Sequence, residues 1–384
     1  MRALVWNGKE DVRVETVPDP KLEQPTDAIV RITSTAICGS DLHLYSKLGP
    51  ALKQGDILGH EPMGIVEEVG AEVSHISPGD RVVVPFNISC GDCFMCDRGL
   101  QSQCETTQNR EWNKGASLFG YTHLYGGVPG GQAEYLRVPM AHYGPIKVPE
   151  VPSDTSLVLL ADVLPTAWQA VEYAEIPDGG TVGVWGLGPI GQLCSRIALY
   201  RRAARVIGID RVPERLAMAR RHGVETVDFE SVDSVPNLVR ELTAGRGVDS
   251  AIDAVGMEAS GSTVDSVLHS VRLQPDRLHA LRECGRAVRR GGTISIIGTY
   301  AGPMPFFPLA DLFDQQISIR MGQANVRRWS DEILTTLVGG DPFGTDDLVT
   351  HVLPLEEGPR GYELFQKKED GVIKIVLQPN GAAA

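Results

Sequence analysis

The sequence predicts an α/β protein in which a doubly wound parallel sheet interrupts a second, β-rich domain. Three stretches of the chain carry this prediction. Residues 1–150 consist of short strand-like segments between turns, residues from about 156 onward alternate apolar strands with helical segments, and the end of the chain returns to a turn-rich strand. Such a βαβαβ order favours parallel strands joined by right-handed crossovers.

The individual elements follow from the spacing of apolar residues. Alternating or continuous apolar runs rich in β-branched residues predict strands in the first part, at residues 3–6, 28–37, 64–70, 80–86 and 130–139. Helical spacing then predicts helices at residues 157–174, 188–203 and 212–223. Between and after them, short apolar runs predict strands at residues 181–185, 205–210, 248–256, 293–300 and 371–379.

Composition and charge limit the kind of partner. The chain has 384 residues, of which 42% are apolar and 22% charged, as in globular proteins of two to three domains. A net charge of −13 without a long basic block argues against nucleic acid and anionic membrane, and favours a small molecule. There is no run of 18 apolar residues and the N-terminal segment is charged, so we predict a cytoplasmic protein.

Four of the seven cysteines are crowded into fifteen residues: Cys90, Cys93, Cys96 and Cys104. An odd, sparse set of cysteines does not suit a disulfide framework in so long a chain. Four thiolates satisfy the tetrahedral preference of zinc and leave no open position, so we predict a structural zinc site. The CxxC spacing also fits a redox pair, but the two additional cysteines fit a metal better.

A glycine pattern opens the second helix. Gly186, Gly188 and Gly191 form GxGxxG directly after an apolar strand, in the run Gly186, Leu187, Gly188, Pro189, Ile190 and Gly191. In this context the first glycine makes a tight turn, the second admits a pyrophosphate and the third allows close helix packing. The helix N-terminus adds unpaired N–H groups, so the segment predicts a dinucleotide site.

Asp210 ends the next strand, nineteen residues after Gly191. A carboxylate there accepts hydrogen bonds from ribose hydroxyls and repels a 2′-phosphate, so NAD is favoured over NADP. Arg211 and Arg215 keep NADP as an alternative, because either guanidinium could pair with a phosphate if Asp210 turned away.

Several motifs together resemble the zinc-containing medium-chain dehydrogenases of the alcohol dehydrogenase type. They are CGSDLH at 38–43, GHE at 59–61, GDRV at 79–82, the four-cysteine segment and GLGPIG at 186–191. PGGQAEYLRVP, ADVLPT and the stretch from Met257 to Cys284 look most like the formaldehyde dehydrogenase branch of that family. The likeness spans nearly the whole chain.

The resemblance implies a division into domains. Residues 1–160 are expected to form the first part of a GroES-like catalytic domain, with a zinc lobe at 88–106. Residues 161–303 are expected to form a Rossmann NAD-binding domain, and residues 304–384 a return to the catalytic domain. A homodimer or homotetramer is also expected.

The resemblance further implies a second, catalytic zinc bound by Cys38, His60 and Asp162. Asp162 stands where many relatives have a cysteine, a departure that the formaldehyde branch shares. Three protein ligands leave one position open for a substrate. Glu61, beside His60, is expected to approach the metal or orient its water.

Ser40 and His43 match the proton relay of the family, in which the alcohol proton leaves through Ser40, the nicotinamide ribose and then His43 while a hydride passes to NAD. For His43, an ordinary surface histidine is the alternative. Weaker matches line the nicotinamide in relatives: Thr166, Val255, Gly256, Ile297, Gly298, Thr299 and Gln323. Phe86 and Trp112 are expected at the wall of the substrate pocket, with ordinary core packing as the alternative.

These observations predict a zinc-dependent, NAD-linked alcohol or aldehyde dehydrogenase with two zinc ions per chain. A second interpretation is a formaldehyde dehydrogenase or dismutase that retains its NAD(H), although the segment 298–323 is shorter than the loop that encloses NAD in those enzymes. A third is a zinc-stabilised scaffold without catalysis, which the intact residues Cys38, His60, Asp162 and Ser40 oppose. The sequence leaves the substrate, the preferred direction and the oligomeric state open.

Overall fold

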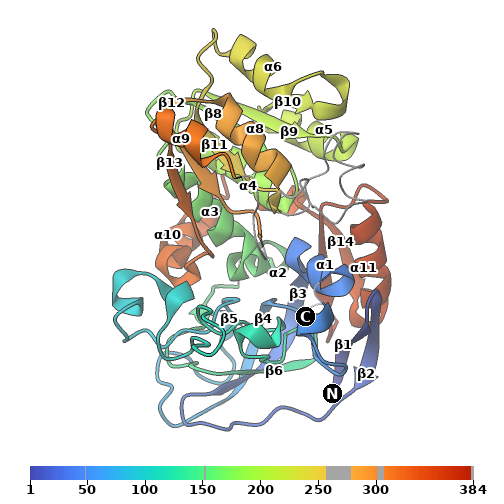
Figure 1. Cartoon of the computed structure of the whole chain (residues 1–384). Helices are drawn as coiled ribbons and strands as arrows, with labels where there is room; N and C mark the ends of the chain where they lie inside the picture. The colour runs from blue at the N-terminus through green and yellow to red at the C-terminus, as the bar shows by residue number, and fades with distance from the viewer. Residues whose placement is uncertain (48, 151–152, 257–277, 301–306, 382–384) are drawn as a thin grey trace. The chain divides into compact units, whose positions relative to one another are not determined.

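The computed structural model of the chain describes residues 1–47, 49–150, 153–256, 278–300 and 307–381 (Figure 1). Residues 257–277, which carry part of the resemblance to the formaldehyde branch, lie outside this range. The chain forms two compact units: unit 1 contains Met1–Pro165 and Ala324–Ala384, and unit 2 contains Thr166–Gln323. Within the described residues, no helix has the length and apolar character needed to cross a membrane.

Unit 1 is built on a seven-stranded sheet with β3 (Ala28–Ile37) at its centre. The strand order is β14-β15-β3-β4-β5-β7, and β6 also pairs with β3. The other strands of this sheet are β4 (Glu61–Val69), β5 (Arg81–Val83), β6 (Tyr135–Val138), β7 (Ile146–Lys147), β14 (Val349–Pro354) and β15 (Lys374–Gln378). A separate antiparallel hairpin is formed by β1 (Arg2–Gly8) and β2 (Asp11–Thr16).

The antiparallel pairing of β3 with β4 brings the end of β3 next to the start of β4. β3 is almost entirely buried, as its apolar run predicts, and pairs antiparallel with β4. A Cβ atom at Gly64 would lie 2.0 Å from the carbonyl oxygen of Arg31, so only glycine lets β4 approach β3 this closely.

The helices of unit 1 are α1 (Gly39–Ser46), α2 (Asp154–Leu157), α10 (Val326–Val338) and α11 (Gly358–Lys367). The sequence predicted one helix over residues 157–174, and this prediction was wrong at Asp162. Here a 3₁₀ turn (Val158–Ala161) ends and α3 (Val163–Tyr173) begins, with Asp162 at φ −150°, ψ −73°. Pro165 has no N–H and would clash with the carbonyl of residue 161 in a continuous helix, so the helix restarts.

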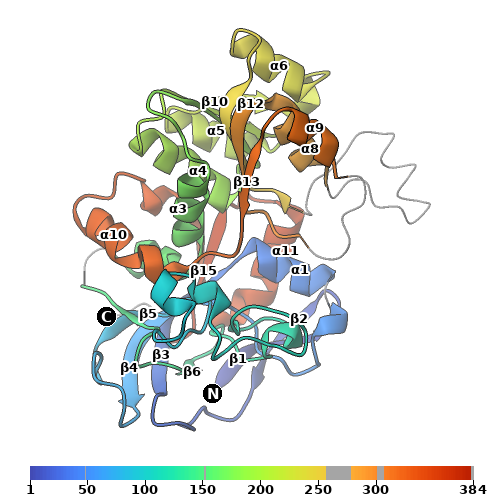
Figure 2. The ribbon, with the colours of Figure 1, turned by 60° about the vertical axis from the view of Figure 1, so that its left-hand side comes forward.

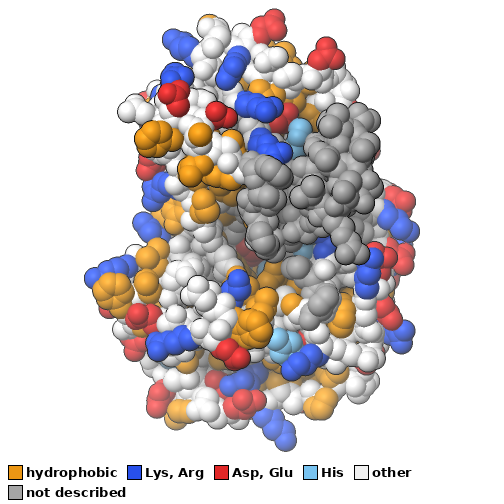
Figure 3. Space-filling model, viewed as in Figure 1, with side chains coloured by type: hydrophobic (Ala, Val, Ile, Leu, Met, Phe, Trp, Pro, Cys, Tyr) orange, Lys and Arg blue, Asp and Glu red, His pale blue; other side chains and the backbone are white. Residues whose placement is uncertain are grey.

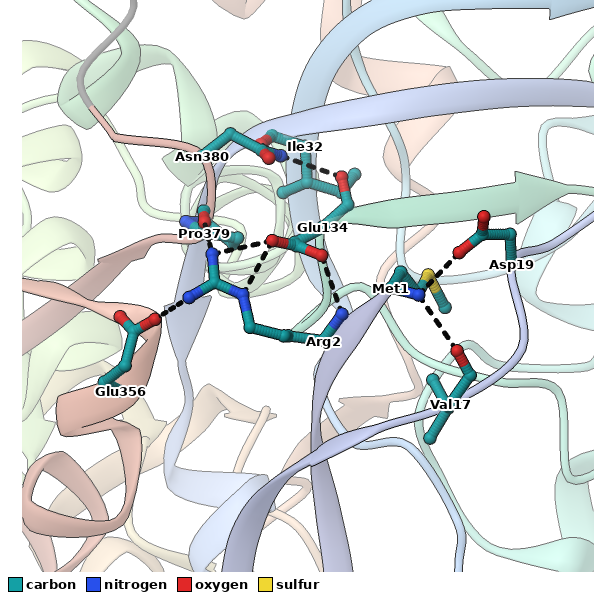
Figure 4. A network of polar contacts seen from close by, with 9 residues as sticks. All are labelled: Met1, Arg2, Val17, Asp19, Ile32, Glu134, Glu356, Pro379 and Asn380. Carbon is teal, nitrogen blue, oxygen red and sulfur yellow. Dashed lines mark hydrogen bonds and ion pairs between the residues drawn. The ribbon is translucent and has the colours of Figure 1, made fainter.

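A polar network ties the start of the chain to its end (Figure 4). The backbone N–H of Arg2 and its Nε donate to the carboxylate of Glu134, at 2.7 and 2.8 Å. The same guanidinium pairs with Glu356. The side-chain amide of Asn380 donates to the carbonyls of Ile32 and Glu134, each at 2.9 Å. β1 and the C-terminal segment are thereby both fastened to the central sheet.

Unit 2 is the doubly wound parallel sheet that the sequence predicted. Its strand order is β10-β9-β8-β11-β12-β13, and every pair is parallel. The strands are β8 (Thr181–Trp185), β9 (Arg205–Asp210), β10 (Glu225–Asp228), β11 (Val248–Asp253), β12 (Val288–Ile296) and β13 (Ser318–Met321). Its helices are α4 (Pro189–Tyr200), α5 (Pro213–Arg221), α6 (Val235–Leu242), α8 (His279–Ala287) and α9 (Leu309–Asp314).

Helices cover both faces of this sheet. α4 and α5 pack together against β8 and β9, whereas α6 and α8 pack together and α8 contacts β11 and β12. Figure 2 shows α4 and α5 on one side of the strands and α8 on the other. The inner strands β8, β9 and β11 are therefore buried almost throughout, which explains why they read as short apolar runs, whereas the edge strands β10 and β13 are partly exposed.

The expected return to the catalytic domain begins later than predicted. Residues 304–384 were expected there, but β13 pairs with β12 and belongs to unit 2, and unit 1 resumes at Ala324.

On the face shown in Figure 3, Lys and Arg side chains lie interspersed with Asp and Glu. The described part of this face therefore lacks the continuous basic surface that a polyanion requires.

Candidate active site and metal centres

Four side chains converge in unit 1: Cys38, His60, Glu61 and Asp162, here called the mixed cluster. All four are buried, and one potential ligand atom from each lies within 4.8 Å of the others. Asp162 Oδ2 lies 3.6 Å from Cys38 Sγ and 3.3 Å from His60 Nε2. A thiol, an imidazole and two carboxylates at this spacing fit the donor set of zinc.

The fold brings these side chains from three separate segments. Cys38 follows β3 and caps α1, while His60 and Glu61 stand at the start of β4. Because Ala36 pairs with Glu61 in the antiparallel ladder, the end of β3 meets the start of β4. Asp162 comes from the helix break, which frees its backbone from helical geometry.

Asp41 contacts two members of the mixed cluster. Its Oδ1 lies 3.0 Å from His60 Nδ1, and its Oδ2 accepts the N–H of Cys38 at 2.9 Å. Behind it, Gln132 Nε2 lies 3.5 Å from the same Oδ2, and the Tyr362 hydroxyl donates to Gln132 Oε1 at 2.9 Å. A carboxylate behind a ligating histidine fixes its tautomer and ring orientation. Sequence reasoning missed this role, although Asp41 lies inside the CGSDLH motif.

Lys374 is the second residue that sequence reasoning missed. It is fully buried in β15, and its Nζ lies 2.5 Å from Oε2 of the equally buried Glu61. β15 pairs with β3 through Ile375 and Ile37, which places the lysine beside the cluster. A single lysine inside the apolar run GVIKIVL was a usable signal, because lysine is almost never fully buried unless it is paired.

Burial and charge set the protonation of the mixed cluster. Burial raises the pKa of the Cys38 thiol and of the Glu61 carboxyl, and the nearby Lys374 opposes both shifts. Burial would lower the pKa of His60, but the Asp41 carboxylate raises it well above its usual value. A zinc ion would displace these protons, because it binds thiolate and neutral imidazole.

The expected proton relay lies on α1. Ser40 Oγ is 3.1 Å from His60 Nε2, so the hydroxyl lies beside the mixed cluster. His43 follows on the same helix about one turn later and is only 4% exposed. This burial is inconsistent with the alternative of an ordinary surface histidine; the relay role itself stays a prediction.

Aromatic rings flank the imidazole of His60. The Phe86 and Tyr121 rings approach it edge-on, with centroid distances of 6.3 and 6.4 Å. Burial raises the pKa of Tyr121, so its hydroxyl keeps its proton. Trp112, expected at the pocket wall, is instead 54% exposed, while Tyr121 was not anticipated. Aromatic residues are frequent in the loops near this tyrosine, which left no distinguishing signal.

The second cluster, here called the four-cysteine cluster, contains Cys90, Cys93, Cys96 and Cys104. Their sulfur atoms lie within 4.8 Å of one another, with Cys90 and Cys104 only 3.6 Å apart. The predicted grouping of these cysteines is therefore present in the structure. Four sulfur donors without another ligand type match a closed structural zinc site.

Backbone N–H groups and one hydroxyl surround the sulfur atoms of the four-cysteine cluster. The N–H of Glu105 donates to Cys93 Sγ at 3.3 Å, and the hydroxyl of Thr106 donates to Cys90 Sγ at 3.2 Å. Burial opposes ionisation of Cys93, but N–H donors from Cys96 and Glu105 outweigh it and lower its pKa to about 6. Burial raises the pKa of Cys90 to about 11.

The glycine turn of unit 2 has the geometry that the sequence predicted. Gly186 follows β8 at φ +86°, Gly188 caps α4, and Pro189 and Ile190 begin its first turn. A Cβ atom at Gly191 would lie 1.8 Å from the carbonyl oxygen of Gly186, so only glycine fits there. The helix N-terminus directly follows the strand end, as in a dinucleotide-binding turn.

Asp210 ties this turn to the next strand end. Its Oδ2 accepts the N–H of Leu187 at 2.7 Å, and its Oδ1 accepts the N–H groups of Arg211 and Val212 at 2.7 and 3.0 Å. The carboxylate is therefore held at the turn by backbone donors.

The two neighbouring arginines are placed differently. The Arg211 guanidinium pairs with Glu230 at 2.9 Å, at an exposed position. Arg215 Nη1 lies 3.9 Å from Asp210 Oδ2 and close to Gly188. Of the two, only Arg215 is directed to the glycine turn.

The residues expected along the nicotinamide occupy α3 and three strand ends: Thr166 on α3, Val255 and Gly256 after β11, Ile297, Gly298 and Thr299 after β12, and Gln323 after β13. The turns after β11 and β12 touch, because a Cβ atom at Gly298 would lie 2.2 Å from the backbone nitrogen of Gly256. The carbonyl of Gln323 accepts the side-chain amide of Gln169 at 3.0 Å.

Comparison with known proteins gives matches along most of the chain. The family model for the alcohol dehydrogenase GroES-like domain matches residues 24–150, and that for zinc-binding dehydrogenases matches residues 189–274. A zinc-type alcohol dehydrogenase-like protein of Bacillus subtilis is 43% identical over 382 residues, covering 99% of this chain and 100% of the relative.

Two further comparisons extend these matches. A formaldehyde dismutase of Pseudomonas putida is 32% identical over 402 residues, covering 99% of this chain and 98% of the relative. Among solved structures, an alcohol dehydrogenase from Thermus sp. ATN1 superposes with a TM-score of 0.83 at 35% identity, covering 98% of this chain and 99% of that one.

Proposed function

The chain belongs to the zinc-containing alcohol dehydrogenases of the medium-chain type, and we propose that it oxidises a primary or secondary alcohol, or a hydrated aldehyde, with NAD. Membership of this family makes the protein a zinc-dependent oxidoreductase. The proposal concerns the cofactor, the substrate class and the roles of individual residues. The homodimer or homotetramer expected from the resemblance stays a prediction.

The observation that carries the proposal is the mixed cluster. Cys38, His60 and Asp162 offer three buried donors of the types zinc prefers, and the Ser40 hydroxyl lies 3.1 Å from the same imidazole. A metal site with a hydroxyl beside it can both bind a substrate oxygen and take up its proton. In the four-cysteine cluster the neighbouring Thr106 hydroxyl donates to Cys90 Sγ, and four sulfur donors would fill the coordination of zinc without a position for a substrate.

When bound, zinc would supply Lewis acidity toward the substrate oxygen and NAD would accept two electrons. The chain's own residues would orient the metal donors and transfer protons. Asp41 holds His60 through Nδ1, which directs Nε2 to the cluster. Ser40 would accept the substrate proton at Oγ, a role supported by its 3.1 Å distance from His60 Nε2, and the buried His43 on the same helix would take it up next.

Lys374 compensates the charge of the buried Glu61 carboxylate, which lies beside the metal donors. The lysine pairs with Glu61 at 2.5 Å, so one of the carboxylates in the cluster is neutralised within the protein. We infer that Glu61 is held by this pair while Cys38, His60 and Asp162 bind the metal.

NAD rather than NADP is supported by the position of Asp210. Its carboxylate is fixed at the glycine turn by three backbone N–H groups, where a 2′-phosphate would meet negative charge. Of the two candidate phosphate ligands, Arg211 pairs with Glu230 at an exposed position, whereas Arg215 lies near the glycine turn and keeps NADP as the alternative.

A second candidate function is a formaldehyde dehydrogenase or dismutase with tightly held NAD(H). It is supported by the 32% identity to the formaldehyde dismutase of Pseudomonas putida, and by Asp162 in place of a cysteine ligand.

The test is zinc analysis and cofactor analysis of protein purified without added NAD, followed by a screen of alcohols and aldehydes with NAD or NADP. Two zinc ions per chain and NAD-dependent turnover are expected. Co-purified NAD(H) with aldehyde consumption in the absence of added cofactor would favour the second candidate. One zinc ion per chain without turnover would overturn both, and a preference for NADP would overturn the cofactor assignment.

A further inference from the structure

Asp253 accepts five hydrogen bonds at the carboxyl end of β11 in unit 2. It ends β11, the strand between β8 and β12, and is fully buried. Its Oδ1 accepts the N–H groups of Val255 and Gly256 at 3.0 and 3.1 Å. These two bonds alone form a local turn of the kind that aspartate often caps.

Three further bonds reach beyond this local turn. The carbonyl oxygen of Asp253 accepts the N–H groups of Ile297 and Gly298 at 3.0 and 2.8 Å. Its Oδ2 accepts the hydroxyl of Tyr300, which lies 47 residues later in the chain. One residue therefore joins the turn after β11 to the turn after β12.

The two turns have no space to adjust independently. Gly256 is at φ +62°, and a Cβ atom there would lie 2.5 Å from the backbone of Thr299. A Cβ atom at Gly298 would lie 2.2 Å from the backbone nitrogen of Gly256. With backbone packed directly on backbone, a shift of one turn must move the other.

The same contact region reaches the dinucleotide turn. A Cβ atom at Gly186 would lie 2.7 Å from the Val255 side chain and 3.3 Å from the carbonyl of Ala254. The turn after β8 therefore meets the turn after β11 mainly through a side chain, which can adjust, whereas the turns after β11 and β12 meet through their backbones. All three lie at the carboxyl edge of a parallel sheet, where ligands bind in open α/β folds.

We propose that the Asp253–Tyr300 hydrogen bond is a positioning pair that sets the turns after β11 and β12 for the nicotinamide half of the cofactor. This inference rests on the proposed NAD-dependent function. Burial and the adjacent Asp253 both raise the pKa of Tyr300, so the hydroxyl stays protonated and remains a donor. Burial likewise raises the pKa of Asp253, while its three donors oppose that shift.

The pair is distinct from the residues that hold the adenosine half. The glycine turn and Asp210 belong to the first two strand ends, β8 and β9, whereas Tyr300 acts on the turns after β11 and β12. Loss of the Tyr300 hydroxyl should therefore affect NADH, which has a nicotinamide, more than ADP-ribose, which does not.

The test is titration of Tyr300→Phe with NADH and, separately, with ADP-ribose, by calorimetry on the full-length zinc-loaded protein. A hydrogen bond to a charged acceptor stabilises a fold more than a neutral one does. Losing even part of that stabilisation at the turns that would hold the nicotinamide should raise the Kd of NADH by about 5- to 10-fold. The Kd of ADP-ribose should stay within about twofold of wild type. Tyr200→Phe, a tyrosine of the same unit on α4, is the matched control and should bind both ligands normally.

Asp253→Asn provides the second variant, because its amide keeps an acceptor for the local turn but replaces the charged acceptor of Tyr300. It should weaken NADH more than Tyr300→Phe, and the double variant should be no weaker than Asp253→Asn alone. Unchanged NADH binding in Tyr300→Phe would overturn the proposal, as would an equal loss of NADH and ADP-ribose binding. If the wild-type protein itself bound neither ligand, the proposed NAD-dependent function would fail first.

Discussion

The two metal-ligand clusters of unit 1 are built in opposite ways. The four-cysteine cluster takes all its donors from one segment of fifteen residues and surrounds them with backbone N–H groups and a threonine hydroxyl. The mixed cluster takes its donors from three distant segments and supports them with the buried charged side chains of Asp41 and Lys374. The first arrangement can fold around a metal locally, whereas the second exists only when the whole unit is assembled.

The donor types of the two clusters suit different roles for the metal. Four like donors complete the coordination of zinc and leave nothing to exchange. In the mixed cluster, one carboxylate is paired with a lysine and a serine hydroxyl lies beside the imidazole, so the protein supplies acid–base groups next to the metal donors. If the two clusters are independent, a change in the ligands or supporting residues of one should leave the metal of the other in place.

The largest effect is expected for Cys38→Ala. Removing one of three ligands should release the zinc of the mixed cluster and lower kcat/KM by more than about 10³-fold, because a Lewis-acid metal contributes several kcal/mol. Zinc analysis should find one ion per chain, and the four-cysteine cluster should keep it. Cys194→Ala, a buried cysteine of unit 2, is the control and should retain both ions and full activity.

Lys374→Met tests the electrostatic support of the mixed cluster. Glu61 would be left as a buried carboxylate without its partner, so the free energy of unfolding should fall by about 3 to 5 kcal/mol. Lys147→Met is the matched control, since its pair with Asp80 lies at the surface and should contribute less than about 1 kcal/mol. Urea denaturation measures both. The double variant Glu61→Gln/Lys374→Met should recover part of the loss, and failure to do so would mean that the lysine acts through packing alone.

The contrast between the clusters also explains what could be predicted from the sequence. Local patterns identified the four-cysteine cluster and the glycine turn, because spacing within a few residues determines both. The strands β8, β9, β11 and β12 and the parallel order of unit 2 followed from the apolar runs and were confirmed, whereas β10 and β13 were not anticipated. The mixed cluster was identified only through resemblance to a family, since nothing in the spacing of residues 38, 60 and 162 links them.

The residues that were missed depend on tertiary contacts. Lys374 meets Glu61 because β15 and β4 both pair with β3, a relation that the sequence does not contain. Tyr121 reaches His60 from a loop without regular spacing. The break at Asp162 was hidden because the apolar pattern is helical on both sides of it.

Cys104→Ser should separate stability from activity. Losing a ligand of the four-cysteine cluster should lower the free energy of unfolding by about 3 kcal/mol, equivalent to about 6 to 12 °C in Tm for a domain of this size. At low temperature the mixed cluster should keep its zinc and its turnover. Calorimetry and metal analysis on the same sample would decide; loss of both zinc ions would show that the clusters are coupled.

Asp41→Asn should act on the mixed cluster alone. The amide keeps the size of the side chain but removes the carboxylate that lies 3.0 Å from His60 Nδ1. Partners of this kind are worth about 10- to 100-fold in metal affinity, so the zinc affinity of the mixed cluster should fall by that factor. Competition with a chromophoric chelator measures it, and the affinity of the four-cysteine cluster should be unchanged. An equal loss at both clusters would contradict their independence.

The smallest effect concerns the cysteines of the zinc-free protein. The pKa of Cys93 is lowered to about 6, whereas that of Cys90 is raised to about 11 and that of the buried Cys38 is also raised. At neutral pH Cys93 is therefore mostly thiolate while the other two are neutral. Because the thiolate is the reactive form, iodoacetamide should modify Cys93 at least about tenfold faster than Cys90 or Cys38.

The alkylation rate of each cysteine should rise with pH until its thiol is fully ionised. The rate of alkylation at Cys93 should rise through about pH 6 and then level off, since the thiol is fully ionised above its pKa. The rate at Cys90 should still be rising above pH 9, because its pKa is about 11. Peptide mass spectrometry after brief labelling distinguishes the sites, and zinc-loaded protein should resist labelling at both clusters. Faster labelling of Cys38 than of Cys93 would contradict the prediction, because the Cys38 thiol would then be less protected by burial than its surroundings indicate.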